Sequence, residues 1–185
     1  MNSLKPLYVD LDGTLIQEDL SHEAFFNFFK TSPIRCLYHL FIFLFLGRPY
    51  LKEQISKNYT VDLSKLKKNY PCIEYIKAAK NNNRDIYLIS GSHQLLVDQI
   101  SIQLNLFNDV FGTHKNFNMI GKNKIAYINQ KLKIFDFDYI GNSKQDLPIW
   151  RYTKKVIFTN AAPSLRKQIN KLNLEEIEIK ENFLK

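Results

Sequence analysis

The sequence has little of what stabilises small secreted proteins. Its 185 residues include only two cysteines, Cys36 and Cys72. Two cysteines cannot form a disulfide framework, and these two lack the close spacing of a metal-binding pair. The first residues, Met-Asn-Ser-Leu-Lys-Pro, contain no apolar run of the kind that a signal peptide needs. We therefore expect a cytoplasmic protein.

Internal repeats, low-complexity linkers and recognised nucleic-acid-binding motifs are also missing from the sequence. A hydrophobic content of 45% and a charged content of 24% are ordinary for a globular domain with a real core. The formal net charge of +8 is less ordinary, and it favours anionic partners such as phosphorylated substrates or a membrane surface. Charge alone does not indicate nucleic-acid binding, so we expect no nucleic-acid partner.

Short apolar segments alternate with helical patterns along most of the chain. The predicted strands cover residues 6–11, 85–89, 109–111, 137–140, 156–158 and 176–179. Strands that alternate with helices indicate an α/β fold with a parallel sheet flanked by helices. Residues 16–70 depart from this alternation and are expected to form a small helical cap inserted after the first strand. The core would then comprise residues 1–15 and 71–185.

The most apolar stretch of the sequence is residues 34–46, and we expect Gly47-Arg48-Pro49 to end it before a polar, lysine-rich helix at about residues 50–58. Its roughly 13 residues fall short of the roughly 20 that span a bilayer. One interpretation is a buried helix of the cap. The other is a peripheral contact with the cytoplasmic face of a membrane, because lysines and arginines dominate the surrounding charges. The sequence leaves both open.

Two aspartates follow the first predicted strand, in Leu7-Tyr8-Val9-Asp10-Leu11-Asp12-Gly13-Thr14-Leu15. Side chains two residues apart on an extended chain lie on the same side, so both carboxylates can face one reacting centre. Gly13 permits the turn that follows. Such a pair can divide the work, one carboxylate attacking and the other moving protons.

This stretch resembles motif I of the haloacid dehalogenase (HAD) superfamily, most of whose members are Mg2+-dependent phosphatases with a Rossmann-like core. The resemblance implies that Asp10 attacks phosphorus and that Asp12 moves the proton. Thr14, which closes the motif, would contact the substrate.

Two further segments resemble motifs II and III of the same superfamily. In Leu-Ile-Ser-Gly-Ser, Ser90 would supply a hydroxyl to catalysis. Gly91 and Ser92 would offer backbone N–H groups to the substrate at the start of a helix, where anions bind readily. In Gly-Lys-Asn-Lys, Lys124 would hold the phosphoryl group, and Lys122 is the alternative. Related sequences often have a lysine just before that glycine, where this chain has Ile120.

Gly141-Asn142-Ser143-Lys144-Gln145-Asp146 resembles motif IV, usually written Gly-Asp-x-x-x-Asp. Asn142 occupies a position where many members have aspartate. An amide oxygen can still bind Mg2+, which prefers oxygen ligands, but it adds no charge. The expected magnesium ligands are Asp10, the backbone carbonyl of Asp12, Asn142 or Asp146, and water.

Within the superfamily, the motifs and the Gly-Arg-Pro after an apolar helix look like the HAD-like domains that precede membrane prenyltransferases of the 4-hydroxybenzoate polyprenyltransferase type. We therefore predict a Mg2+-dependent phosphomonoesterase that acts through an aspartyl-phosphate on a small-molecule or lipid phosphate. The alternative is a catalytically weak HAD-like module that binds a membrane surface or an enzyme of envelope-lipid synthesis. The neutral Asn142 and the basic, apolar cap motivate it.

Overall fold

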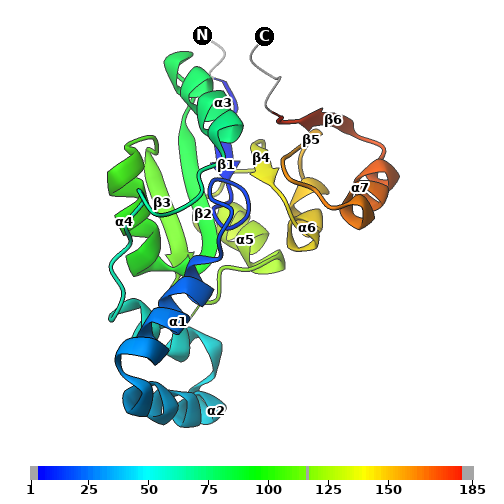
Figure 1. The fold of residues 1–185 in the computed structure, drawn as a ribbon. Helices are drawn as coiled ribbons and strands as arrows, with labels where there is room; N and C mark the ends of the chain where they lie inside the picture. Colours follow the sequence, from blue (N-terminus) through cyan, green and yellow to red (C-terminus); the bar gives the residue numbers. More distant parts are fainter. Residues whose placement is uncertain (1–3, 116, 181–185) are drawn as a thin grey trace.

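Six parallel strands form one sheet within residues 4–115 and 117–180, the residues that the computed structural model describes. Figure 1 shows the sheet, whose strand order is β3-β2-β1-β4-β5-β6. The strands are β1 (Leu7–Val9), β2 (Ile86–His93), β3 (Asp109–Thr113), β4 (Asp138–Gly141), β5 (Lys155–Phe158) and β6 (Glu175–Glu178). The predicted parallel α/β architecture is confirmed.

Helices connect consecutive strands, as parallel strands require. The α-helices are α1 (Leu20–Thr31), α2 (Pro33–Ser56), α3 (Tyr70–Asn81), α4 (Gln94–Leu104), α5 (Lys122–Ala126), α6 (Leu147–Trp150) and α7 (Pro163–Ile169). A π-helical turn at Tyr127–Lys131 and 3-10 turns at Lys144–Asp146 and Asn170–Leu172 complete the helical segments.

Strand β1 lies at the centre of the sheet, and its side chains alternate between two apolar cores. Leu7 and Val9 face the core that includes side chains of α3 and α4. Tyr8 faces the opposite core, which includes side chains of α5, α6 and α7 and the fully buried Trp150. Because both faces of the sheet are covered, its central strands are almost entirely buried.

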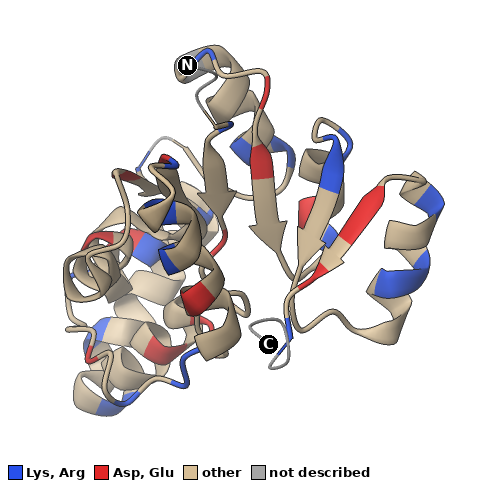
Figure 2. Cartoon of the chain, turned by 90° about the horizontal axis from the view of Figure 1, so that it is seen from above, with Lys and Arg blue, Asp and Glu red and all other residues tan. Residues whose placement is uncertain are grey.

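The far edge of the sheet is polar. Figure 2 shows acidic residues along β6 beside basic residues on α7. An ion pair between Arg166 and Glu178 joins these two elements. Charged side chains on an edge strand discourage pairing with another chain, so this edge is protected.

Helices α1 and α2 pack against each other beyond the carboxyl ends of the strands (Figure 1). Asp19 caps α1, because its side chain accepts hydrogen bonds from the N–H groups of Ser21 and His22. The division into a core and a cap at residues 16–70 stays a prediction, although these two helices are where the cap is expected.

Helix α2 is interrupted at Gly47, whose φ of 76° and ψ of −176° are not helical. A positive φ is easy only for glycine, so this residue sets the break between an apolar half and a polar half. His39 Nδ1 and Tyr50 Oη, from the two halves, lie within hydrogen-bonding distance at 2.7 Å. The predicted break at Gly47-Arg48-Pro49 is therefore present.

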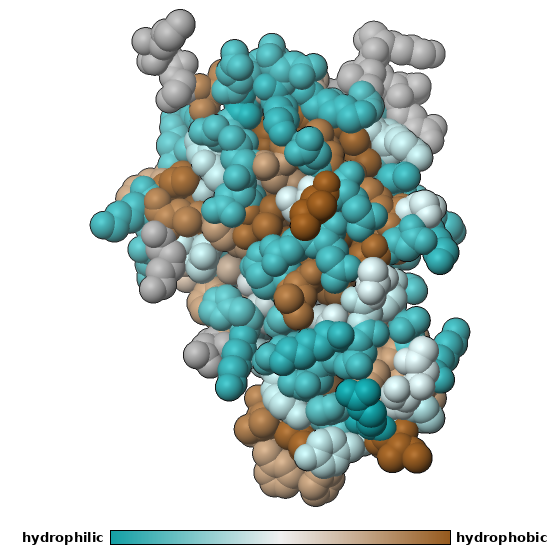
Figure 3. Space-filling view, turned by 90° about the vertical axis from the view of Figure 1, so that its left-hand side faces the viewer, coloured by the Kyte–Doolittle hydropathy of each residue, from teal (hydrophilic) through white to brown (hydrophobic). Residues whose placement is uncertain are grey.

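The apolar half of α2 leaves large side chains in solvent. Their exposed fractions run from 58% to 83%, for Ile34, Leu37, Tyr38, Phe41, Leu44, Phe45 and Leu46. Figure 3 shows apolar side chains gathered at the end of the molecule where α2 lies. By length and composition α2 is long and apolar enough to cross a membrane. Its apolar half before Gly47 is too short to cross roughly 30 Å of hydrocarbon alone.

Candidate active site

The carboxyl ends of β2, β1 and β4 meet at one edge of the sheet, because these strands are parallel neighbours in register. Val9 pairs with Leu88 on one side and with Ile140 on the other. The residues that follow these pairs are Asp10, Ser90 and Asn142, each within two positions. Open α/β sheets place their ligands at this edge. Three predicted site segments thus converge there.

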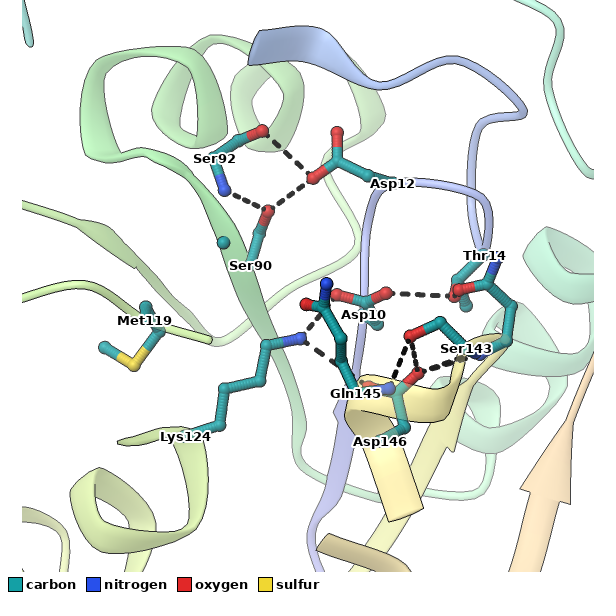
Figure 4. Close-up of polar contacts among 12 residues, drawn as sticks. Asp10, Asp12, Thr14, Ser90, Ser92, Met119, Lys124, Ser143, Gln145 and Asp146 are labelled. Carbon is teal, nitrogen blue, oxygen red and sulfur yellow. Dashed lines mark hydrogen bonds and ion pairs between the residues drawn. The ribbon is translucent and has the colours of Figure 1, made fainter. Parts of the chain in front are cut away.

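Asp10 lies at the centre of this site and is buried. Its Oδ1 accepts a hydrogen bond from Lys124 Nζ at 2.5 Å, and its Oδ2 accepts one from Thr14 Oγ1 at 3.2 Å (Figure 4). Burial raises the pKa of Asp10 to about 7, while the Lys124 ammonium opposes the shift and the Asp146 carboxylate adds to it. The carboxylate therefore depends on nearby cations to stay charged.

Lys124, and not the exposed Lys122, reaches the site. The Lys124 ammonium donates a second hydrogen bond to Tyr139 Oη at 2.8 Å, and this hydroxyl donates to Asp146 Oδ1 at 2.7 Å. The amine is 4.0 Å from that same oxygen of Asp146. A chain of contacts therefore fixes Lys124 against Asp10, which favours it over Lys122 as the phosphate-binding lysine.

Asp12 faces the same pocket from the next turn of the chain (Figure 4). Its Oδ2 accepts hydrogen bonds from the hydroxyls of Ser90 and Ser92, both at 2.9 Å. Its Oδ1 accepts one from the backbone N–H of Leu20, the first residue of α1, at 2.9 Å. Burial raises the pKa of Asp12, and these three donors oppose that shift. Asp12 therefore connects the sheet edge with α1.

The Ser90-Gly91-Ser92 segment differs from its expected structure. Strand β2 continues through it to His93, with irregular pairing to β3 between Ile89 and His93, and α4 begins only at Gln94. Ser92 N–H donates to Ser90 Oγ at 2.9 Å. The prediction that Gly91 and Ser92 sit at a helix N-terminus was wrong, because the strand persists and His93 caps the helix. Their part in substrate binding stays a prediction.

Asp146 shapes the loop after β4. Its Oδ2 accepts hydrogen bonds from Asn142 N–H, Ser143 N–H and Ser143 Oγ at 2.9 to 3.1 Å. Its Oδ1 accepts from Tyr139, so both oxygens are already engaged. This arrangement favours Asp146 as a support for Asn142 rather than as a ligand that directly contacts a metal.

Asn142 packs directly on the turn that follows Asp12. Gly13 has a φ of 76°, and a Cβ added there would lie 2.0 Å from Asn142 Nδ2. Only glycine fits this contact. Thr14 Oγ1 lies 3.3 Å from Asn142 Oδ1 and also donates a hydrogen bond to Asp10 Oδ2. The Thr14 hydroxyl therefore brings these oxygens of Asn142 and Asp10 close to one point.

The resulting pocket has a volume of about 250 Å3. Four carboxylates and two lysines line it: Asp10, Asp12, Asp19, Asp146, Lys52 and Lys124. The carboxylates outnumber the lysines, so the pocket lining has a net negative charge that would repel a phosphate. A divalent cation would offset this excess. Lys52, Ser21 and Tyr139 are the site residues that sequence patterns missed, since no local motif marks any of them.

The oxygen atoms at the sheet edge fit a hard cation. Asp10 supplies a carboxylate and Asn142 an amide oxygen, and Mg2+ accepts such ligands while keeping several waters. Among the described residues, no group of three or more His, Cys, Asp and Glu side chains has the arrangement of a metal cage. The fit to Mg2+ therefore rests on the oxygens of Asp10 and Asn142 alone.

Sequence comparisons give a distant relative but no family. No protein-family model matches the chain. An uncharacterised protein of Sinorhizobium fredii, y4nM, is 29% identical over 170 residues, which is 92% of this chain and 33% of that protein. The chain thus spans about a third of the length of this curated relative.

Solved structures define the class of the fold. A protein of unknown function from Bordetella pertussis has a TM-score of 0.72 at 12% identity, covering 97% of this chain and 100% of that one. A HAD family hydrolase from Salmonella enterica serovar Typhi has a TM-score of 0.62 at 14% identity, covering 94% and 68%. A phosphoserine phosphatase, solved as a phospho-aspartyl intermediate analogue, has a TM-score of 0.57 at 16% identity, covering 97% and 95%. The chain has the HAD-like α/β fold, as its motifs predict.

Proposed function

We propose that this protein is a phosphatase that hydrolyses phosphomonoesters through a covalent aspartyl-phosphate on Asp10. The observation that carries the proposal is the buried Asp10 carboxylate held by Lys124 at 2.5 Å, beside Asp12 and Ser90, at the carboxyl end of the central strand. A nucleophile, a proton carrier and donors for phosphoryl oxygens are the parts that phosphoryl transfer needs. The HAD-like fold, shared with a phosphatase captured as a phospho-aspartyl analogue, supports this assignment.

In the first half of the reaction, a carboxylate oxygen of Asp10 bonds to phosphorus, and the bond between phosphorus and the ester oxygen breaks. The leaving oxygen takes a proton from Asp12. In the second half, a water oxygen bonds to phosphorus and gives its proton to Asp12, and the bond from phosphorus to Asp10 breaks. Inorganic phosphate leaves, and both carboxylates return to their starting states.

Burial suits Asp12 to this exchange, because the raised pKa lets the carboxyl carry a proton more readily than an exposed aspartate would. The hydroxyls of Ser90 and Ser92 and the N–H of Leu20 hold it in place. Lys124 keeps Asp10 oriented and offers positive charge to the phosphoryl oxygens. Gly91 lines the pocket, whereas Thr14 is fully buried and supports Asp10 through its hydroxyl.

Mg2+ would be held by Asp10, the Asp12 carbonyl and Asn142, with Asp146 supporting the loop. When bound, it would offset the negative charge of the pocket lining and the charge of the phosphoryl group.

We expect chelation to remove activity. Treatment with EDTA should lower phosphate release by at least about 100-fold, and added Mg2+ should restore it, because the pocket otherwise repels an anionic substrate. The measurement is phosphate release from a panel of phosphomonoesters, including prenyl phosphates and phosphosugars, at fixed ionic strength. Ca2+ serves as the control cation. Unchanged activity in EDTA would remove the metal from the proposal.

We also propose that the apolar half of α2 contacts the cytoplasmic face of an anionic membrane. Its exposed apolar side chains lie next to the exposed cations Lys30, Arg35 and Arg48. Apolar side chains bordered by positive charge are typical of helices that lie in the bilayer interface. A cytoplasmic location fits the two free cysteines, both buried. The phosphorylated substrate could then be a soluble metabolite or a lipid phosphate.

Vesicle flotation tests this surface. The protein should float with vesicles containing phosphatidylserine and remain unbound with purely zwitterionic vesicles. Replacing Phe41 and Phe45 by Gln should lower the bound fraction at least about tenfold, since each change removes an apolar anchor. The matched control is Phe135→Gln, because Phe135 is exposed but lies outside α2. This variant should bind like the wild type. Equal flotation of all three proteins would contradict the proposal. So would a wild type that binds no lipid but self-associates, if the double variant abolishes that self-association.

If flotation succeeds and the whole substrate panel stays inert with Mg2+ present, the alternative function is favoured. The protein would then be a HAD-like module that binds a membrane surface or an envelope-lipid enzyme.

A further inference from the structure

One cation in the pocket has no part in the chemistry described above. Lys52 lies in the polar half of α2, after the break at Gly47, and its side chain reaches back to the sheet. Its Nζ donates hydrogen bonds to the Gly91 carbonyl at 2.5 Å and to Asn118 Oδ1 at 3.2 Å. It lines the same pocket as Asp10 and Lys124. Lys52 is therefore a charge brought to the site from the predicted cap.

The two partners of Lys52 are neutral, and both lie within reach of a second donor, the Thr113 hydroxyl. Thr113 Oγ1 donates to the Gly91 carbonyl at 2.8 Å and lies 3.3 Å from Asn118 Oδ1. Among the described residues, Lys52 has no carboxylate within salt-bridge distance. Burial lowers the pKa of Lys52, because neutral oxygens replace lost water only in part. The Asp12 and Asp19 carboxylates of the same pocket oppose this shift from beyond salt-bridge distance, so among the described residues no anion contacts the Lys52 ammonium directly.

The pocket indicates what kind of group could be the anionic partner of Lys52. Its volume is about 250 Å3, and most of the residues around it are polar. Met119 and Ile120 are the apolar side chains among those lining it. The apolar half of α2 contributes none of the lining residues. A long apolar tail therefore has no matching surface inside, whereas a small anionic group beside Lys52 has one.

We propose that Lys52 binds a second anionic group of the substrate, so that the preferred substrate is a small phosphomonoester that carries a carboxylate or a further phosphate. The proposal rests on the phosphatase function and narrows its substrate class. If the substrate is a lipid phosphate, its tail must lie outside this pocket.

The test compares two probes of nearly equal size. Glycerol 3-phosphate carries a hydroxymethyl group where 3-phosphoglycerate carries a carboxylate. The wild type should favour 3-phosphoglycerate, and Lys52→Met should raise its KM about tenfold or more, as expected for a lost hydrogen bond to a charged group. The KM for glycerol 3-phosphate should change less than about twofold, because that probe makes no ion pair with Lys52. Lys52→Arg, which keeps the charge, should retain most of the preference.

A second lysine of the same helix region provides the control. Lys57 is half exposed and pairs with Glu53, so Lys57→Met should leave both KM values unchanged. Circular dichroism and the Tm of each variant show whether α2 stays folded. A Lys52→Met variant that weakens both probes equally would overturn the proposal, since Lys52 would then only fasten the helix to the sheet. A wild type with no preference between the probes would overturn it as well.

Binding separates this proposal from the phosphatase function. Titration calorimetry with Mg2+ measures the same two probes on Asp10→Asn protein, with and without Lys52→Met. If the wild type hydrolyses neither probe, the phosphatase proposal fails for this class of substrate. The Lys52 site still stands if 3-phosphoglycerate binds more tightly and loses that advantage in Lys52→Met, and it falls if the two probes bind alike.

Discussion

Asp10→Asn should abolish phosphate release while leaving the protein folded. We expect a loss of about 10,000-fold or more, comparable to the removal of a nucleophile in other enzymes that form covalent intermediates. The amide is a poor nucleophile and cannot form the acyl phosphate. It is nearly isosteric with the carboxylate, and its one oxygen can still accept the hydrogen bond from Lys124, while its NH2 group can donate to the Thr14 hydroxyl. Steady-state phosphate release with Mg2+ measures the effect, and the Tm reports the fold.

The matched control is Asp136→Asn. Asp136 is exposed and pairs with Lys5; both residues precede their strands, β4 and β1, and so lie at the opposite end of the sheet from the site. The same chemical change there should leave activity within about twofold of the wild type. If Asp10→Asn retained full activity, Asp10 could not be the nucleophile, and the mechanism proposed here would be wrong.

Lys124→Met should lower kcat about 1,000-fold, which is the scale of losing a fixed positive group at a developing charge. The substitution preserves most of the side-chain volume but removes the ammonium that contacts Asp10 and Tyr139. It also leaves a buried carboxylate without its cation, so the free energy of unfolding should fall. Kinetics across Mg2+ concentrations and denaturant unfolding measure the two effects.

Lys122→Met is the corresponding control. Lys122 is the first residue of α5, the short helix that also contains Lys124, and its side chain is exposed. We expect it to retain nearly full activity. The opposite pattern, with activity lost in Lys122→Met and kept in Lys124→Met, would reject the assignment that the structure favours.

The elements that the sequence predicted well are those with strong local patterns. An apolar run that ends in Asp-x-Asp-Gly-Thr specifies a buried strand and a turn, and the structure places β1 and Gly13 accordingly. The break in α2 at Gly47 was equally visible, because glycine and proline mark it in the sequence. Such features depend on a few neighbouring residues.

Features that depend on distant contacts were missed or placed wrongly. The Ser90-Gly91-Ser92 segment looks like a loop before a helix, yet pairing with β3 extends the strand to His93. Lys52 contacts Gly91, which is 39 positions away in the sequence, and no neighbouring residue distinguishes Lys52 from other lysines. Asp146 matches a motif, but only the structure shows both its oxygens engaged by Tyr139 and the loop after β4.

The most direct test of the account is to trap the covalent intermediate. Protein mixed with Mg2+ and a phosphomonoester labelled at phosphorus is quenched in acid within milliseconds, digested and analysed by mass spectrometry. We predict an alkali-labile phosphoryl group on the peptide that contains Asp10, at the highest level before the steady state and missing from Asp10→Asn. Hydrolysis that proceeds in the wild type without any label on Asp10 would contradict the central claim.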